Sequence, residues 1–401
     1  MTNTLSAQEA ARQLGVSRQT LYAYVSRGLL RAHEDADPRR SRYSSEAVAR
    51  LAGERRRGRR PREVAKATLD WGMPVLESGI TLIREGRLFY RSADALALAR
   101  DATVEEVAAL LWRMPAAEAF GGAAPACPPV LAALAPFHAG RPRDEALLPL
   151  FAAATTDDAT ATWQTEPRRL AAGCGALVRV LLACVVDAAP GTSLGTSPGA
   201  APLHLQLATA WGLDAAGADL VRAALILCAD HELNASGFTA RCVASTGASL
   251  RAAVIGGLAA LSGGRHGGTT ARIETLWRGL DGHDLSGQLR RRLAAGEALP
   301  GFGHPLYPEG DPRAAALLAR LGPRFPEARA LAAAAADLTG QAPNIDFALV
   351  ALRRCLGLPE GSAFGLFALG RSIGWIAHAL EQRESGGLIR PRAVYTGPMP
   401  G

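Results

Sequence analysis

Apolar residues recur at helical spacing along most of this chain. Runs rich in Ala, Leu and Val occur at 170–187, 219–230, 314–320 and 364–381. Thr103 and Glu106 have the spacing of a capping box at the start of one more helix. Proline and glycine clusters separate the runs, at 121–129, 189–202 and 296–312. The pattern predicts an all-α body from about residue 64 onward.

One segment breaks the helical period. ITLIREGRLFYR, at 80–91, has a glycine at its centre and β-branched or aromatic residues on both sides. Such a segment is typical of a β-hairpin, with Gly86 in its turn.

The first fifty residues predict a separate helical module. In LSAQEAARQLGVSRQTLYAYVSRGLLR, Ser6 and Glu9 form a capping box, and a turn over 15–17 leads into a second helix. Leu21, Tyr24 and Val25 lie on one face of that helix. Two short helices joined by a glycine-containing turn describe a helix-turn-helix. The following GLLRAHEDADPRRSRYSSEAVARLA predicts a short hairpin, or wing, and a helix capped by Ser44 or Ser45.

This module resembles the winged helix-turn-helix of the excisionase/MerR type, through LGVSRQTLYAYVSRGLL followed by RYS. The resemblance implies DNA contacts from the second helix and backbone contacts from the wing. The residues concerned are Ser17, Arg18, Gln19, Thr20, Tyr22, Arg39, Arg40 and Arg42. The alternative is a small interaction domain with a solvated basic face.

The charge distribution supports two modules with different partners. Residues 1–62 hold fourteen arginines and six acids, a charge of +8, whereas the remaining 30 basic and 31 acidic residues carry −1. Such asymmetry indicates a nucleic-acid or membrane-surface module joined to a near-neutral body. We therefore expect a domain at 1–52, an arginine-rich linker at 53–63 and a body at 64–401.

The spacing of the cysteines helps to predict the cellular compartment of the protein. Six cysteines are scattered without CxxC spacing, and we interpret them as buried thiols, not as a disulfide framework or a metal site. No apolar signal core or long uninterrupted apolar stretch is present. These observations predict a cytoplasmic protein with no metal.

Candidate chemistry lies in a few polar segments of the body. LCADHELNASGFTAR contains His231, LSGGRHGGTTAR contains His266, PGFGHPLYPEGDPR contains His304 and Arg313, and APNIDF contains Asp346. Each segment has a structural alternative: a polar helix end, a packing bend, a proline-rich turn, or an Asn344 helix cap with an acid in the first turn. Arg371, Arg390 and Arg392 are, taken singly, ordinary surface charges.

Taken together, these residues suit one kind of reaction. A carboxylate base removes a proton next to a carbonyl while imidazoles donate hydrogen bonds to the developing oxyanions. Arginines bind a dicarboxylate through bidentate pairs.

The body resembles the citrate synthase family from about Trp71 to Gly397. ADHELNAS, GGRHGG, GFGHPLYPEGDPRA, PNIDF, GRSIGWIAH and IRPRAVYTG occur in the family's order, and GRLFYRSADALALARDATVEEVAALLW resembles its N-terminal signature. The resemblance implies an all-α homodimer with a large and a small domain around a cleft, the small one at roughly 273–372.

The resemblance also implies roles for individual residues. Asp346 removes a proton from acetyl-CoA, His266 donates to the thioester oxygen, and His304 polarises the ketone of oxaloacetate. His231, Arg313 and Arg371 hold the oxaloacetate carboxylates, with Arg390 reaching in from the partner subunit. Citryl-CoA is then hydrolysed to citrate and CoA. The acyl-CoA is a co-substrate, and no permanently bound cofactor is implied.

Two departures from the family pattern concern the acyl-CoA. Thr269 and Thr270 replace the usual Ala-Asn after the first histidine, and Pro305 and Pro308 stand where many members have basic residues, some of which contact CoA phosphates. Three functions stay open: a citrate synthase, a chemically related enzyme (a 2-methylcitrate synthase using propionyl-CoA, or one working in the direction of citryl-CoA cleavage), and a metabolite-sensing DNA-binding regulator.

Overall fold

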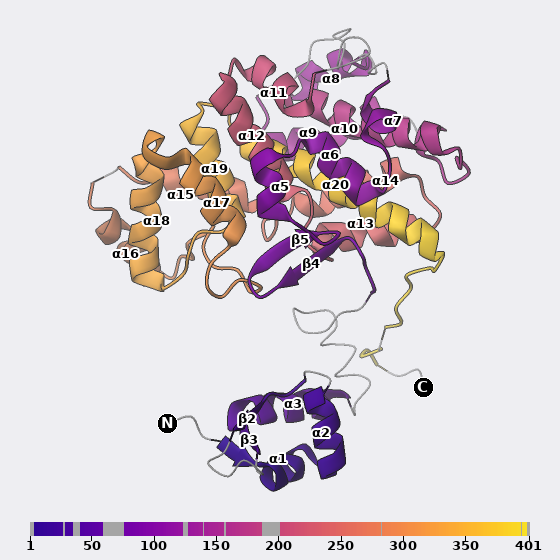
Figure 1. The fold of residues 1–401 in the computed structure, drawn as a ribbon. Helices are drawn as coiled ribbons and strands as arrows, with labels where there is room; N and C mark the ends of the chain where they lie inside the picture. The colour runs from indigo at the N-terminus through magenta and orange to yellow at the C-terminus, as the bar shows by residue number, and fades with distance from the viewer. Residues whose placement is uncertain are drawn as a thin grey trace. The chain divides into compact units, whose positions relative to one another are not determined.

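The computed structural model describes residues 4–26, 29–34, 41–58, 76–122, 127–138, 140–155, 158–186, 201–281, 283–393 and 395–398. Two compact units make up the chain, Met1–Glu77 and Ser78–Gly401 (Figure 1).

The N-terminal unit is a helix-turn-helix with a three-stranded antiparallel sheet. Its elements in chain order are β1 (Thr4–Ser6), α1 (Ala7–Leu14), α2 (Arg18–Ser26), β2 (Ala32–Glu34), β3 (Ser41–Ser44) and α3 (Ser45–Gly58). Strand β3 lies in the middle of the sheet, and His33 on β2 pairs with Arg42 on β3. The predicted wing is therefore present, and β1 is an additional strand that the sequence did not reveal.

Local sequence signals explain the ends of these helices. The Ser6 backbone N–H donates to the Glu9 carboxylate at 2.8 Å, and the Ser6 hydroxyl accepts from the Glu9 N–H at 3.3 Å, which completes the expected capping box. Gly15 ends α1 with φ 64°, a conformation that suits glycine. Helix α3 continues through Gly58, so the first part of the predicted linker is helical, whereas residues 59–63 lie outside the described residues.

The second unit is the predicted helical body (Figure 1). Its helices are α5 (Ala95–Asp101), α6 (Val104–Trp112), α7 (Ala116–Phe120), α8 (Val130–His138), α9 (Arg143–Ala154), α10 (Pro167–Val186), α11 (Leu203–Trp211), α12 (Ala215–Cys228), α13 (Ala235–Ser245), α14 (Leu250–Leu261), α15 (Thr269–Arg278), α16 (Leu285–Ala294), α17 (Pro312–Leu321), α18 (Pro326–Thr339), α19 (Ile345–Cys355) and α20 (Ser362–Ser385). Short 3-10 turns occur at Asp158–Thr160 and Gly322–Arg324.

The expected hairpin precedes these helices. Strands β4 (Thr81–Arg84) and β5 (Arg87–Tyr90) pair antiparallel, and a short β6 (Ala93–Asp94) adds to β5. Glu85 and Gly86 form the two-residue turn with φ of 53° and 73°. Positive φ at both positions is the geometry of the tight hairpin turn that matches strand twist.

Helix α20 is the central element of the body. It is buried along most of its length and contacts α6, α9, α10, α12, α13, α14 and α19. Gly374 allows a close approach to the end of α12, because a Cβ there would lie 2.4 Å from the Ala229 carbonyl oxygen. The Gly374 N–H donates to that oxygen at 2.9 Å. This contact fixes the point at which the chain leaves α12 and enters the first polar segment.

Candidate active site

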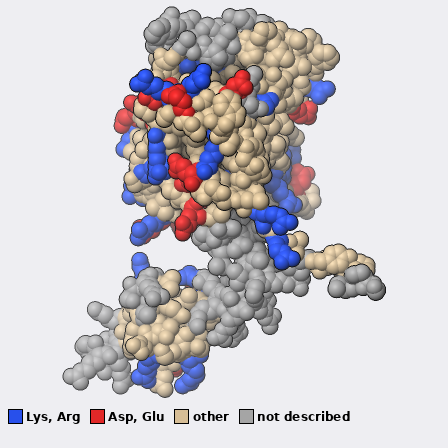
Figure 2. All heavy atoms as spheres, turned by 90° about the vertical axis from the view of Figure 1, so that its right-hand side faces the viewer, with Lys and Arg blue, Asp and Glu red and all other residues tan. Residues whose placement is uncertain are grey.

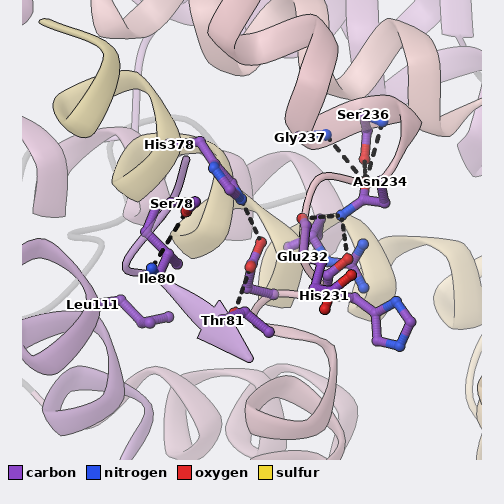
Figure 3. A network of polar contacts seen from close by, with 12 residues as sticks. Ser78, Ile80, Thr81, Leu111, His231, Glu232, Asn234, Ser236, Gly237 and His378 are labelled. Carbon is purple, nitrogen blue, oxygen red and sulfur yellow. Dashed lines mark hydrogen bonds and ion pairs between the residues drawn. The ribbon is translucent and has the colours of Figure 1, made fainter. Parts of the chain in front are cut away.

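The segment after α12 places His231 through a network of buried polar contacts (Figure 3). Thr81 donates its hydroxyl to the Asp230 carboxylate at 2.6 Å, and His378 Nε2 lies 3.2 Å from the other Asp230 oxygen. Asn234 caps α13 and donates its side-chain amide to the His231 and Glu232 carbonyl oxygens, both at 3.2 Å. The backbone on both sides of His231 is therefore held.

Asp230 keeps its charge in this network. Burial alone would raise the pKa of its carboxyl, but the contacts with His378, Arg371 and Thr81 outweigh burial and hold the pKa below its ordinary value. Both Asp230 and His378 are completely inaccessible to solvent. The pair anchors the base of the His231 segment to the central helix.

His266 lies in the glycine turn between α14 and α15. A Cβ at Gly268 would lie 2.4 Å from the Ser262 carbonyl oxygen, so the turn closes only around glycine. The His266 Nε2 atom lies 2.8 Å from the Ser236 hydroxyl, which itself lies 2.7 Å from the Asn234 side-chain oxygen.

The Ser236 hydroxyl has one proton to donate, and this limits the hydrogen bonds of His266. The Asn234 oxygen can only accept, so the network assigns the hydroxyl proton to Asn234 and makes His266 Nε2–H the donor to Ser236. Donation from Nδ1 of the neutral ring requires the hydroxyl to turn toward His266 instead. Ser236 therefore controls which nitrogen of His266 carries the proton.

His304 lies on a loop that is attached to the start of α19. The Gly303 N–H donates to the Ala342 carbonyl at 2.8 Å, and the Asn344 N–H donates to the Gly301 carbonyl at 2.9 Å. His304 Nδ1 accepts from the Leu306 N–H at 3.2 Å. The neutral ring therefore carries its proton on Nε2, which is then a donor.

Tyr307 connects two of the histidines. Its hydroxyl lies 3.0 Å from His231 Nε2, and the ring centres of His231 and His304 are 5.1 Å apart. Tyr307 is itself buried and packs against His304, with ring centres 5.1 Å apart. The first and third histidine segments thus meet directly.

Two buried arginines lie beside these groups. Asp311 binds Arg313 in a bidentate pair, with contacts of 2.9 Å to Nε and 2.8 Å to Nη2. Asp311 also accepts from the Ile345 N–H at 3.0 Å, which joins the His304 loop to α19 a second time. Arg371 donates its Nε to the Cys228 carbonyl at 2.7 Å, its only hydrogen bond in the described part of the chain.

Asp346 occupies the first turn of α19, whose cap is Asn344 as expected. Its Oδ1 atom is buried and has no hydrogen-bond partner among the described residues. Burial raises the pKa of Asp346 to about 7, with the Asp311 charge adding to the rise and Arg313 and Arg371 opposing it. A helix-capping role does not explain such a carboxyl, because the helix dipole would lower its pKa.

The three histidines are neutral at neutral pH. Burial lowers the pKa of His266 to about 3 and that of His304 to about 4, and it takes that of His231 well below the ordinary value. The positive charge of Arg371 lowers all three further. Each ring is therefore a neutral hydrogen-bond partner, and the charge of Arg371 acts on all three rings and on the Asp346 carboxyl, which titrates near neutral pH. Neutral imidazoles together with a carboxyl of this pKa are what general acid-base chemistry requires.

Most of the predicted site residues lie in this one region. The exception is Arg390, which is exposed in the segment after α20 and has no polar partner among the described residues. Its role across a subunit interface stays a prediction. The sequence reasoning missed Tyr307, Asp311, Ser236 and His378. The first three lie inside the polar segments that it singled out, and His378 ends the GRSIGWIAH motif.

The N-terminal unit presents the predicted DNA-contacting residues in different ways. Arg18, Gln19 and Tyr22 are exposed on α2, whereas the Ser17 hydroxyl accepts from the Thr20 N–H at 3.2 Å and so caps the helix. Arginine side chains protrude from the surface of this unit (Figure 2). Arg42 lies on β3, and Arg39 and Arg40 lie outside the described residues.

The chain matches two families. Residues 68–392 match "Citrate synthase, C-terminal domain" and residues 4–56 match "Helix-turn-helix domain". The chain belongs to the citrate synthase family, and it carries an N-terminal helix-turn-helix domain. Both resemblances seen in the sequence are thereby confirmed.

The match between this chain and several curated relatives covers about half of each relative's length. A putative citrate synthase 2 of Mycobacterium tuberculosis is 41% identical over 43% of this chain and 49% of its own. A citrate synthase of Haloferax volcanii is 38% identical over 43% and 49%, and a 2-methylcitrate synthase of M. tuberculosis is 36% identical over 43% and 47%. The chain thus spans about half the length of the curated relatives it matches.

Solved structures confirm the fold. Citrate synthase from Thermotoga maritima superposes with a TM-score of 0.68 at 24% identity, over 82% of this chain and 95% of that chain. The Thermoplasma acidophilum enzyme, solved with carboxymethyl coenzyme A and oxaloacetate, superposes with a TM-score of 0.69 at 24% identity, over the same shares.

Proposed function

We propose that this chain is a cytoplasmic citrate synthase that condenses acetyl-CoA with oxaloacetate. The observation that carries the proposal is the buried carboxyl of Asp346, which has a pKa of about 7 and an oxygen without a hydrogen-bond partner among the described residues. Neutral His266 and His304, which lie in the field of the same Arg371, complete the set. Support also comes from the family, and from the Thermoplasma enzyme, whose structure contains oxaloacetate and a CoA derivative.

In the proposed reaction, ionised Asp346 takes a proton from the methyl carbon of the thioester. His266 donates a hydrogen bond to the thioester oxygen, which requires the Ser236 hydroxyl to turn toward its Nε2 atom. The resulting enol or enolate carbon attacks the ketone of oxaloacetate, and His304 Nε2–H supplies the proton to the new alkoxide. Water then cleaves the citryl thioester, which releases citrate and CoA.

Oxaloacetate carries two carboxylates, and the buried arginines suit them. Arg371 has both terminal nitrogens free of hydrogen bonds within the described residues, whereas Asp311 already binds two nitrogens of Arg313. We therefore assign the stronger substrate contact to Arg371. His231, fixed by Tyr307, contributes a neutral hydrogen bond.

A thiol-release assay with acetyl-CoA and oxaloacetate tests this proposal. The purified chain should liberate CoA thiol, and Asp346→Asn should abolish the release. Glu327→Gln is the matched control, because Glu327 is an exposed acid in the first turn of α18. Absence of thiol release with either acetyl-CoA or propionyl-CoA would remove the enzymatic proposal.

The acyl donor is a separate question, because the relatives include both a citrate synthase and a 2-methylcitrate synthase. We propose that the acyl donor is acetyl-CoA. The value of kcat/KM for acetyl-CoA divided by that for propionyl-CoA shows which of the two the chain prefers. A ratio below one would make the chain a 2-methylcitrate synthase with the same base and donors.

The helix-turn-helix domain supports a second proposal, that the chain also binds DNA. Arg18 and Gln19 are exposed on the second helix, which enters the major groove in proteins of this kind. A homodimer, as proposed from the family, would favour a two-fold symmetric site. Gel shifts with the upstream DNA of the chain should weaken steeply as salt is raised and in Arg18→Ala; a shift insensitive to both would contradict the proposal.

A further inference from the structure

The β4–β5 hairpin has no role in the chemistry above, yet it contacts the segment that carries His231 (Figure 3). The Thr81 hydroxyl donates to the Asp230 carboxylate at 2.6 Å, and the Ile83 N–H donates to the Glu232 carboxylate at 3.3 Å. Strand β4 is an edge strand of its sheet, so the Glu232 carboxylate takes the place that a neighbouring strand would have. The strand therefore binds the residue before His231 and the residue after it.

Tyr90, on strand β5, adds a third contact between the hairpin and this segment. Tyr90 is completely buried, and its hydroxyl donates to the Ile226 carbonyl at 2.9 Å. The same hydroxyl accepts from the Asp230 N–H at 3.3 Å. The hairpin thus holds both the backbone and the side chain of Asp230.

Glu232 has an unusual backbone conformation that depends on such contacts. Its φ is 49°, in the left-handed region, which costs free energy for any residue with a Cβ. The Ile83 N–H holds its side chain, and the Asn234 amide holds its carbonyl at 3.2 Å. A return of Glu232 to an ordinary φ would rotate the chain on both sides of it, and His231 would move as well.

Asp230 connects the hairpin to the second group that binds the substrate. The Asp230 carboxylate is fully buried, so removal of the Thr81 hydroxyl would leave one of its oxygens without that hydrogen bond. The charges of Asp230 and Arg371 attract each other inside the body. A shift of the carboxylate would therefore change the position of the Arg371 guanidinium too.

We propose that the β4–β5 hairpin is a positioning element of the oxaloacetate site, which acts through Asp230 and Glu232 on His231 and Arg371. The inference rests on the proposed function, because it supposes that His231 and Arg371 bind the carboxylates of oxaloacetate. It gives Thr81 a role in the affinity for this substrate and none in the chemical step.

The kinetic test compares Thr81→Val, which removes the hydroxyl and keeps the shape, with Thr81→Ser, which keeps the hydroxyl. We expect KM for oxaloacetate to rise about tenfold in Thr81→Val and to stay near the parent value in Thr81→Ser, with kcat nearly unchanged in both. Thr155→Val is the matched control, because Thr155 is a half-buried threonine at the end of α9 that donates to the Phe151 carbonyl at 2.9 Å. It should keep the parent KM. A parent-like KM in Thr81→Val, or a fall in kcat alone, would overturn the proposal.

A second pair of variants tests the other side of His231 and is independent of how well Thr81→Val folds. Glu232→Ala removes the acceptor of the Ile83 N–H, whereas Glu232→Gln keeps an oxygen there. KM for oxaloacetate should rise about tenfold in Glu232→Ala and much less in Glu232→Gln. Equal KM values in these two variants would contradict the role of this bond.

Calorimetric titration with oxaloacetate, together with urea unfolding, separates positioning from stability and from turnover. Weaker oxaloacetate binding in Thr81→Val that is restored in Thr81→Ser supports the hairpin's role, even in a chain without thiol release. If Thr81→Val unfolds at lower urea but binds oxaloacetate as the parent does, the bond is only structural and this inference alone is wrong. A parent chain that does not bind oxaloacetate removes both this inference and the proposed function.

Discussion

Replacing Asp346 by asparagine should make the body more stable while removing its activity. The carboxyl is buried, and the pKa of about 7 lies far above its ordinary value of 3.8. Between these values the native state holds a proton that the unfolded chain has released. Above pH 7 both states are ionised, and the native state then carries the full free-energy cost of a buried charge.

The size of this cost follows from the two pKa values. A difference of about three pKa units corresponds to about 4 kcal/mol of lost unfolding free energy above pH 7, and the loss falls to nearly zero by pH 4. Asparagine has the same shape and no charge, so Asp346→Asn should recover up to about 4 kcal/mol at pH 8 and almost nothing at pH 4.

Denaturant unfolding at the two pH values measures the effect. Tryptophan fluorescence follows the body, because Trp112 and Trp375 are buried in it. Glu327→Gln again serves as the control and should show no gain that depends on pH. If Asp346→Asn is no more stable than the parent at pH 8, or is equally stabilised at pH 4, the buried-charge argument is wrong and Arg313 and Arg371 fully compensate the carboxylate.

Three further outcomes test the same site. The kcat/KM for acetyl-CoA should rise with pH through about 7, because Asp346 must be ionised to act as the base. At pH 6 it should be about tenfold lower than the constant value reached at high pH. A kcat/KM that does not change between pH 5 and 8 contradicts the role of Asp346 as the base. Ser236→Ala should lower kcat by one to two orders of magnitude with little change in KM for oxaloacetate, since Ser236 orients His266. Ser236→Thr keeps the hydroxyl and should recover part of the loss. An unchanged kcat in Ser236→Ala would exclude the role of Ser236 in orienting His266. Tyr307→Phe should raise KM for oxaloacetate roughly fivefold by freeing His231, and a fall in kcat alone would place the tyrosine in the chemical step.

The sequence allowed the helices and much of the site to be predicted because both depend on local signals. The capping boxes at Ser6 and Thr103 are present, and so is the hairpin turn at Gly86. The prediction for Asp346 combined a helix start with a family motif, and the structure adds a pKa raised to about 7. The cause of the raised pKa is burial, which no local sequence pattern reports.

The parts that could not be predicted depend on contacts between distant segments. Tyr307 meets His231 across 76 positions, and His378 meets Asp230 across 148. Asp311 was visible beside Arg313, but its pairing removes two of the donors that a substrate would otherwise use. Such competition between a structural partner and a ligand appears only when the side chains are placed in space.

The backbone pairing between 301–303 and 342–344 has a consequence for attempts to redesign this protein. His304 and Asp346 are carried by two segments that are held together by the Gly303 and Asn344 N–H bonds and by Asp311. Because each of these bonds spans the two segments, a grafted segment whose backbone followed a different path would break them together. Exchange of acyl-CoA preference by loop transplantation therefore has to move 300–311 and 341–346 as one cassette.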